Sequence, residues 1–147
     1  MARRAGIGDA TMYRHFPTRC ELIIAVYADE VAALCAEGEA LLEDEEPGDA
    51  LFRWLRVFVA HVAARRELAL AIPNDQGGRR SELFEGWHGA MHSTASRLLT
   101  RAQGVGAADK DLDPADLLVL AGGIAVAGSG AEQAERCLML LRRGIGP

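Results

Sequence analysis

The sequence predicts an all-α protein, and three observations support this fold class. Half of the 147 residues are hydrophobic, but alanine, leucine and valine dominate them and isoleucine is scarce, a bias that favours helices over sheets. The sequence holds no convincing run of alternating apolar and polar residues, the pattern that indicates a strand. Apolar residues instead recur at helical spacing in segments that end at clusters of Gly, Pro and Asp.

The first unit is predicted close to the N-terminus. Gly6 can adopt the positive φ that ends one helix, and Pro17 cannot continue the short helix after it. Thr18 and Glu21 form an S/T-x-x-E capping box, which starts a new helix. A tight turn, a short helix and a newly capped helix resemble the second half of a helix-turn-helix, which lays a helix in the major groove of DNA.

Two long helices and one short helix are predicted between residues 18 and 80. The first covers residues 18–41. The turn Pro47-Gly48-Asp49 makes Asp49 the expected N-cap of the second, which we expect to end near residues 65–66, where cations suit the helix dipole. A short helix is expected over residues 67–72, followed by a loop rich in Gly, Asn and Asp over residues 73–80.

Three further helices are predicted after this loop. Ser81 is the expected N-cap of a long helix that ends near Gly104. Asp113 and Pro114 have the residue types of an N-cap and a first helical position, so another helix starts there. The last helix is expected over residues 131–143, with Ala134, Cys137, Leu138 and Leu141 on its inner side.

The N-terminal motif resembles the tetracycline-repressor (TetR) family of regulators. The family pattern is roughly Ala-Gly-Val-x-x-x-Thr-Leu-Tyr-x-His-Phe-x-x-Lys-x-x-Leu. The matching residues here are Ala5-Gly6-Ile7, Thr11-Met12-Tyr13, His15-Phe16, Arg19 and Leu22. The resemblance implies a partial helix-turn-helix domain over residues 1–24 and a helical-bundle domain for ligand binding and dimerisation over residues 25–147. The family usually has a helix and most of another before Ala5, so we expect the chain to be truncated within this domain.

The resemblance also implies roles for individual residues of the motif. Thr11 would contact the bases, whereas Tyr13, His15 and Arg19 would bind phosphates, Arg19 at a helix start whose N–H groups favour anions. Two residues depart from the family pattern: Asp9 would repel phosphate or accept from a cytosine amino group, and Arg19 replaces the usual lysine. The predicted DNA-binding set is Gly8, Asp9, Thr11, Tyr13, Arg14, His15 and Arg19.

The distribution of charge agrees with a protein that meets DNA at one end. Four arginines against Asp9 leave residues 1–19 with a charge of +3, and since the whole chain carries −5, the remainder carries −8. A basic end on an acidic body suits contact with a polyanion. A few charges near a terminus can equally have no such role.

Two groups of residues have the composition of further sites, and both are also compatible with an ordinary core. Aromatic and methionine side chains with one imidazole suggest a small-molecule pocket between two helices: Trp54, Phe58, His61, Phe84, Trp87 and Met91. Small and apolar residues near the C-terminus suggest close helix packing in a homodimer, as the resemblance also implies: Leu117, Leu120, Ala121, Ile124, Gly128, Leu138 and Leu141.

Several classes of protein are disfavoured by the sequence. His88 and His92 are four residues apart, but neither an intervening Glu nor a third ligand is evident, so no metal or other cofactor is expected. The cysteines are three in number and isolated, which suits the cytoplasm. The longest apolar segment, residues 117–130, is shorter than the about 20 residues needed to cross a bilayer. An enzyme that uses His61 or His88 is disfavoured because no partner base is visible.

The sequence therefore favours a transcriptional regulator. The leading hypothesis is a repressor that binds a palindromic double-stranded operator as a homodimer and releases it on binding a small apolar or amphipathic effector. The alternative is a truncated helical dimer, incompetent to bind DNA, that binds a small molecule or pairs with full-length relatives. Salt-sensitive binding to duplex DNA would separate the two.

Overall fold

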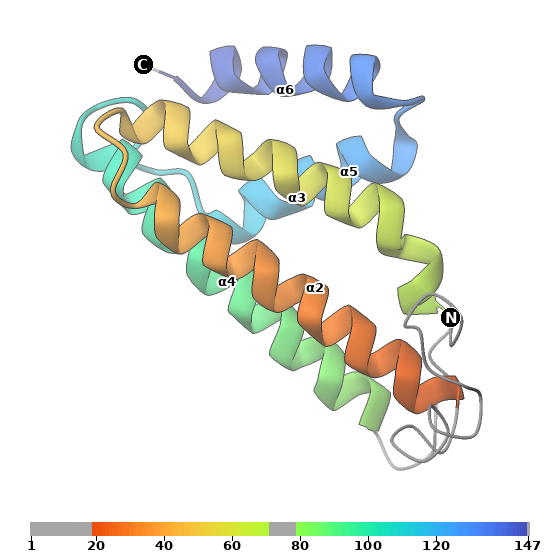
Figure 1. Ribbon diagram of the computed structural model, residues 1–147. Coiled ribbons are helices and arrows are strands. Elements are labelled where there is room, and N and C mark those ends of the chain that lie inside the picture. The colour runs from red at the N-terminus through yellow and green to blue at the C-terminus, as the bar shows by residue number, and fades with distance from the viewer. Residues whose placement is uncertain (1–18, 71–78, 147) are drawn as a thin grey trace.

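A computed structural model describes residues 19–70 and 79–146 of the chain. This part folds into helices joined by short connections, which confirms the predicted all-α class (Figure 1). The helices are α2 (Arg19–Leu41), α3 (Pro47–Leu70), α4 (Arg79–Gly104), α5 (Pro114–Ala127) and α6 (Ala131–Ile145). Of the residues predicted to bind DNA, only Arg19 is among those described; Gly8, Asp9, Thr11, Tyr13, Arg14 and His15 lie outside them.

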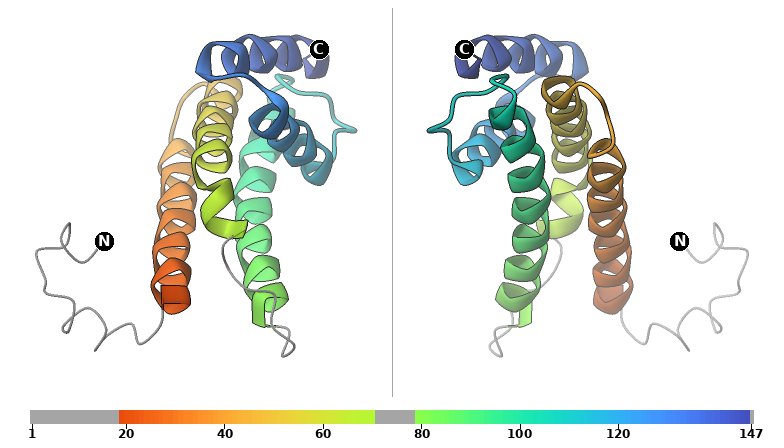
Figure 2. Two further views of the ribbon diagram at one scale, coloured as in Figure 1. Left: turned by 90° about the vertical axis from the view of Figure 1, so that its right-hand side faces the viewer. Right: turned by 90° about the vertical axis from the view of Figure 1, so that its left-hand side faces the viewer.

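Three long helices form an elongated bundle, and two shorter helices pack at one end of it. Helices α2 and α4 lie side by side and start at the same end of the bundle, whereas α3 runs in the opposite direction (Figures 1 and 2). Helices α5 and α6 lie towards the far end from the start of α2 (Figure 2). Helix α3 contacts each of the other four described helices, so it is the centre of the fold.

The start of α5 agrees with the sequence, whereas the start of α3 does not. The side chain of Asp113 accepts a hydrogen bond from the backbone N–H of Ala115 at 2.8 Å, and Pro114 is the first helical residue. Helix α3 begins at Pro47, two residues before the expected N-cap Asp49. The physical reason is the same in both helices, because a proline at the first helical position has a suitable φ and no N–H that needs a partner.

Two other expected boundaries were wrong. Helix α3 continues to Leu70 instead of ending near residues 65–66, so no separate helix starts at residue 67. Arginine, leucine and alanine are good helix formers, so the pair of arginines does not end the helix. Helix α4 begins at Arg79, which places Ser81 inside its first turn and not at the N-cap.

The core lies where α3 meets α2 and α4. Trp54 is fully buried and its indole N–H donates to the backbone carbonyl of Leu34 at 3.0 Å, which ties α3 to α2. Gly38 allows α2 to approach closely, because a Cβ at this position would overlap the Cγ2 atom of Thr94 and lie 3.0 Å from the indole nitrogen of Trp54. The largest fully buried side chains are Trp54, Leu51, Leu55, Leu98, Leu99 and Leu117.

Helix α6 is attached to α3 by apolar contacts, two ion pairs and a cation–π contact, in which the guanidinium of Arg142 lies 5.3 Å from the ring centroid of Phe52. Leu138 is buried in the common core. Arg56 of α3 contacts Glu135 at 2.7 Å, and Arg142 of α6 contacts Asp49 at 2.6 Å. Because all four charged side chains are close to half exposed, the pairs orient α6 more than they stabilise it.

Candidate functional site

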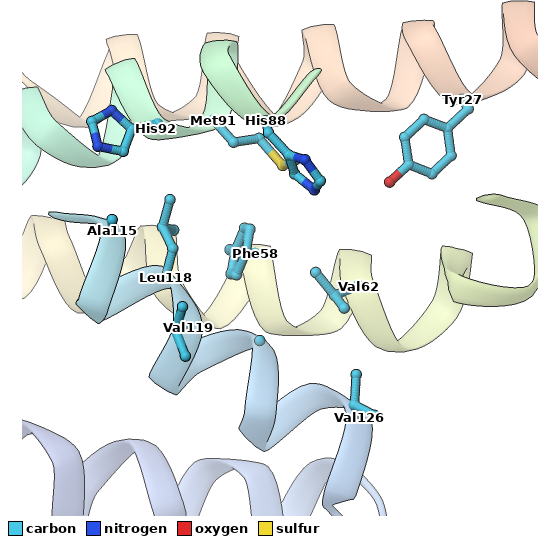
Figure 3. Close-up of a pocket in the computed structure, with 11 residues that line it drawn as sticks. Tyr27, Phe58, Val62, His88, Met91, His92, Ala115, Leu118, Val119 and Val126 are labelled. Atoms are coloured by element: carbon cyan, nitrogen blue, oxygen red, sulfur yellow. The ribbon is translucent and has the colours of Figure 1, made fainter. Parts of the chain in front are cut away.

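A pocket of about 500 Å³ lies between four of the described helices. Its volume falls within the range of about 300–1,000 Å³ that is typical of small-molecule sites. Figure 3 shows side chains of α2, α3, α4 and α5 surrounding one space. The lining residues are Tyr27, Phe58, Val62, His88, Met91, His92, Ala115, Leu118, Val119, Gly122 and Val126.

The pocket has one polar side and one apolar side. Its polar groups are the hydroxyl of Tyr27 on α2 and the imidazoles of His88 and His92 on α4. The residues that α3 and α5 contribute are aliphatic, apart from Phe58 and Gly122. A site with an apolar wall and a few polar groups on one side suits a mainly apolar molecule.

Burial controls the chemistry of the Tyr27 hydroxyl. Desolvation raises the pKa of this phenol above its ordinary value of 10.0. Tyrosine is already protonated at neutral pH and burial favours this form further, so the hydroxyl can donate one hydrogen bond as well as accept others. Figure 3 shows it directed towards the space between the lining side chains.

Two of the six residues predicted to bind a ligand, Phe58 and Met91, line the pocket. Trp54 does not, because it lies in the core, where its ring stacks on Phe58 with a centroid distance of 5.4 Å. Phe58 is thus held between the core and the pocket. The role of these residues as ligand contacts stays a prediction.

The other three predicted ligand residues lie around Tyr27 instead of lining the pocket. Trp87 packs against the Tyr27 ring at a centroid distance of 4.5 Å, and Phe84 packs against Trp87 at 5.6 Å. His61 lies 5.6 Å from the Tyr27 ring and borders a separate, smaller hollow of about 360 Å³ that contains Glu30 and Glu37. These aromatic contacts position Tyr27 within the bundle.

The sequence did carry signals for the lining residues that were missed. His88 and His92 share a helix face with the predicted Met91 at i, i+3, i+4 spacing, although His88 was considered only as a metal ligand or an enzyme residue and His92 only as a metal ligand. Val119, Gly122 and Val126 share a face of α5 in the same way. Nothing in the sequence indicated that this face of α5 meets α4, because that depends on how the bundle packs.

The residues predicted to form a dimer separate into two groups. Leu117, Ala121 and Leu138 are buried in this chain's own core, so they do not form its surface. Ile124, Gly128 and Leu141 are half-buried, and Leu120 is 47% exposed. Four large apolar residues that the prediction omitted are also on the surface of α5 and α6: Val119, 72% exposed, Val126, 51% exposed, Met139, 49% exposed, and Leu140, 64% exposed.

The described residues include no group of three or more side chains that could hold a metal ion. Among the described helices, none combines the length and hydropathy needed to cross a membrane. Arg19, the one described residue of the DNA-binding set, is exposed at the first position of α2.

Comparisons with known proteins agree on one family. Residues 46–147 match a TetR C-terminal domain described as "Transcriptional regulator SbtR-like, C-terminal domain". No curated protein matches the chain in sequence. The similar solved structures include the TetR transcriptional regulator SCO0520 from Streptomyces coelicolor, which is 32% identical, with a TM-score of 0.83 over 99% of this chain and 85% of that chain.

Two further solved structures extend this result. The TetR transcription regulatory protein from Mycobacterium vanbaalenii is 33% identical, with a TM-score of 0.76 over 99% of this chain and 80% of that chain. The TetR family regulator PfmR from Thermus thermophilus is 18% identical and shares the fold, with a TM-score of 0.70 over 99% of this chain and 87% of that chain.

The domain match spans more than half of this chain, and two structural relatives exceed 30% identity over almost all of it. The chain therefore belongs to the TetR family of transcriptional regulators, which act on DNA and are not enzymes.

Proposed function

We propose that this regulator is a repressor that binds a palindromic operator as a homodimer in the cytoplasm and releases it when a small molecule fills the pocket. The observation that carries the proposal is which helices form the wall of the pocket. One helix of the wall, α2, begins at the predicted DNA-binding segment, and another, α5, carries exposed apolar residues suited to a second copy.

Helix α2 supplies a physical link between the pocket and DNA. Arg19, a predicted phosphate contact, is the first residue of α2, and Tyr27 in the pocket follows on the same helix. Eight residues correspond to roughly 12 Å along an α-helix. A ligand that displaces Tyr27 would therefore move the start of α2, because a helix transmits motion along its axis with little deformation.

The ligand can act only through a difference in affinity between two arrangements of the dimer. We propose that the empty pocket allows both copies to place their recognition helices in successive major grooves, whereas the filled pocket favours another spacing. Val119 and Val126 support this coupling, since both line the pocket and are also exposed on α5.

The first test is a fluorescence-anisotropy titration of the chain with duplex DNA from its own promoter region at several salt concentrations. We expect affinity to fall steeply as salt rises, because phosphate contacts release counterions. Tyr13→Phe and Arg19→Ala should each weaken binding to all duplexes about equally. Thr11→Ala should change the preferred sequence instead.

Two outcomes would contradict the proposal in different ways. If Tyr13→Phe and Arg19→Ala both leave affinity unchanged at low and moderate salt, the assigned phosphate contacts are wrong. If the chain binds no duplex while remaining a dimer, the ligand-binding dimer without DNA activity becomes the better description. A form extended upstream by one helix, titrated in parallel, shows whether further residues are required for operator binding.

A further inference from the structure

The buried wall of the described pocket holds no carboxylate, ammonium or guanidinium group. None of the described lining residues is Asp, Glu, Lys or Arg, and the two lining histidines, His88 and His92, are exposed. A charged group moved from water against the buried part of this wall loses its hydration and meets no oppositely charged side chain there. The part of a ligand that is buried here must therefore be uncharged.

The pocket nevertheless offers one polar anchor in a defined place. The ring of Tyr27 is held between Trp87, at a centroid distance of 4.5 Å, and His61, at 5.6 Å. The phenol is protonated at neutral pH, as tyrosine ordinarily is, so the hydroxyl that faces the pocket can donate to an acceptor on the ligand. His88 and His92 are exposed, so they lie where a ligand would still be hydrated.

The apolar side of the pocket has space for a rigid hydrocarbon body. Phe58 and Val62 line it from α3, and Leu118, Val119 and Val126 line it from α5 (Figure 3). Gly122 lies in the same wall, and a Cβ at this position would meet no atom within 4 Å. The absence of a side chain there leaves part of the volume of about 500 Å³ open.

We infer that the pocket takes an uncharged, mainly apolar molecule with a hydrogen-bond acceptor, and that this acceptor pairs with the Tyr27 hydroxyl. The inference rests on the proposed ligand response and adds to it the chemical class of the ligand. Its apolar body lies against α3 and α5, and its acceptor points towards α2.

Three probes with one aromatic body test this class: acetylnaphthalene, a neutral acceptor; isopropenylnaphthalene, its hydrocarbon isostere; and naphthoate, an anion. Binding is measured by calorimetry, and in parallel by tryptophan fluorescence, which reports on Trp87, packed on Tyr27, together with Trp54, stacked on Phe58. We expect acetylnaphthalene to bind about fivefold more tightly than the hydrocarbon, the effect of one neutral hydrogen bond. Naphthoate should bind at least about tenfold more weakly than acetylnaphthalene.

Variants separate the hydrogen bond from the shape of the pocket. In Tyr27→Phe, which removes only the hydroxyl, acetylnaphthalene and the hydrocarbon should bind equally. Gly122→Leu should weaken binding of all three probes because it fills the pocket. Gly86→Leu is the matched control: this glycine of α4 is exposed, lies outside the pocket and also has no atom within 4 Å of an added Cβ, so all three affinities should be unchanged.

Three results would overturn the inference. Naphthoate could bind more tightly than acetylnaphthalene, or none of the probes could bind. The third is that Tyr27→Phe lowers the affinity for acetylnaphthalene and for isopropenylnaphthalene by the same factor. The failure of the proposed function looks different. If acetylnaphthalene binds as expected but never lowers the affinity for operator DNA, the ligand class stands and the ligand-responsive regulation is wrong.

Discussion

At the scale of single residues, Gly38 decides how closely α2 can approach the rest of the bundle. It is buried in the last turn of α2, and glycine within a helix is normally unfavourable. Its position is explained by Thr94 and Trp54, whose atoms occupy the space that a Cβ would need. Without this close approach, the indole of Trp54 would lose its hydrogen bond to Leu34.

We expect Gly38→Ala to destabilise the protein by about 2 kcal/mol, because overpacking outweighs the gain in helix propensity. Urea unfolding followed by circular dichroism measures the change. Thr94→Ser in the same chain should restore part of the loss, since it removes the Cγ2 atom that the new Cβ meets and keeps a hydroxyl for the carbonyl of Ala90. Gly89→Ala, at an exposed and uncrowded position of α4, should instead stabilise by about 0.5–1 kcal/mol. An equal effect at the two glycines would contradict the close-packing explanation.

At the scale of elements, the ion pairs that attach α6 to α3 make this contact dependent on pH. A hydrogen bond from Arg142 lowers the pKa of Asp49 below its ordinary value of 3.8, and one from Arg56 lowers the pKa of Glu135 below 4.5. A carboxylate whose pKa is lower in the folded state stabilises the fold above its unfolded pKa, and this stabilisation is lost as the pH falls through the folded value.

The double variant Asp49→Asn, Glu135→Gln should therefore unfold at a slightly lower temperature than the parent at about pH 7. The difference should disappear as the pH falls through the lowered pKa values, which lie below 3.8 for Asp49 and below 4.5 for Glu135. Both pairs are exposed, so the effect should be small and should shrink in concentrated salt. Thermal unfolding across this pH range measures it. Glu132→Gln, on the exposed side of α6, is the control. A difference that persists at low pH would show that the substitutions act through packing and not through charge.

The element boundaries also show where local signals are sufficient. Asp113 and Pro114 start α5 as predicted, because a cap and a proline act on the backbone next to them. The end of α3 was misplaced because a pair of arginines favours the end of a helix without requiring it. Only a residue type that excludes helical geometry in the interior of a helix, such as proline, sets a firm limit.

At the scale of the whole molecule, the exposed apolar residues of α5 and α6 are the surface most suited to a second copy. Leu120, Met139 and Leu140 are large and about half exposed or more, and Gly123 and Ala127 on the exposed side of α5 would allow close helix approach. A symmetric pairing of this surface would bring the same face of both copies together.

Leu120→Glu should weaken the dimer about 100-fold or more, because a carboxylate buried in each copy would lack a partner. Sedimentation equilibrium measures the association, and operator affinity should fall together with it. Val105→Glu is the control, since Val105 is also exposed and apolar but lies in the loop after α4 and not on the surface of α5 or α6. If Leu120→Glu remains as dimeric as the control variant, the interface lies elsewhere.

The order of residues along the chain was enough to predict the all-α class, the apolar faces of the helices, the start of α5 and the family motif, because each depends on residues a few positions apart. Only the packed bundle showed that Leu117, Ala121 and Leu138 are core, and that Trp54 supports the pocket without lining it. The packing also brought Tyr27 of α2 to the same space as residues of α4 and α5. Helical periodicity shows which residues share a face, but the partner of that face is set by packing across the whole chain, which no local pattern encodes.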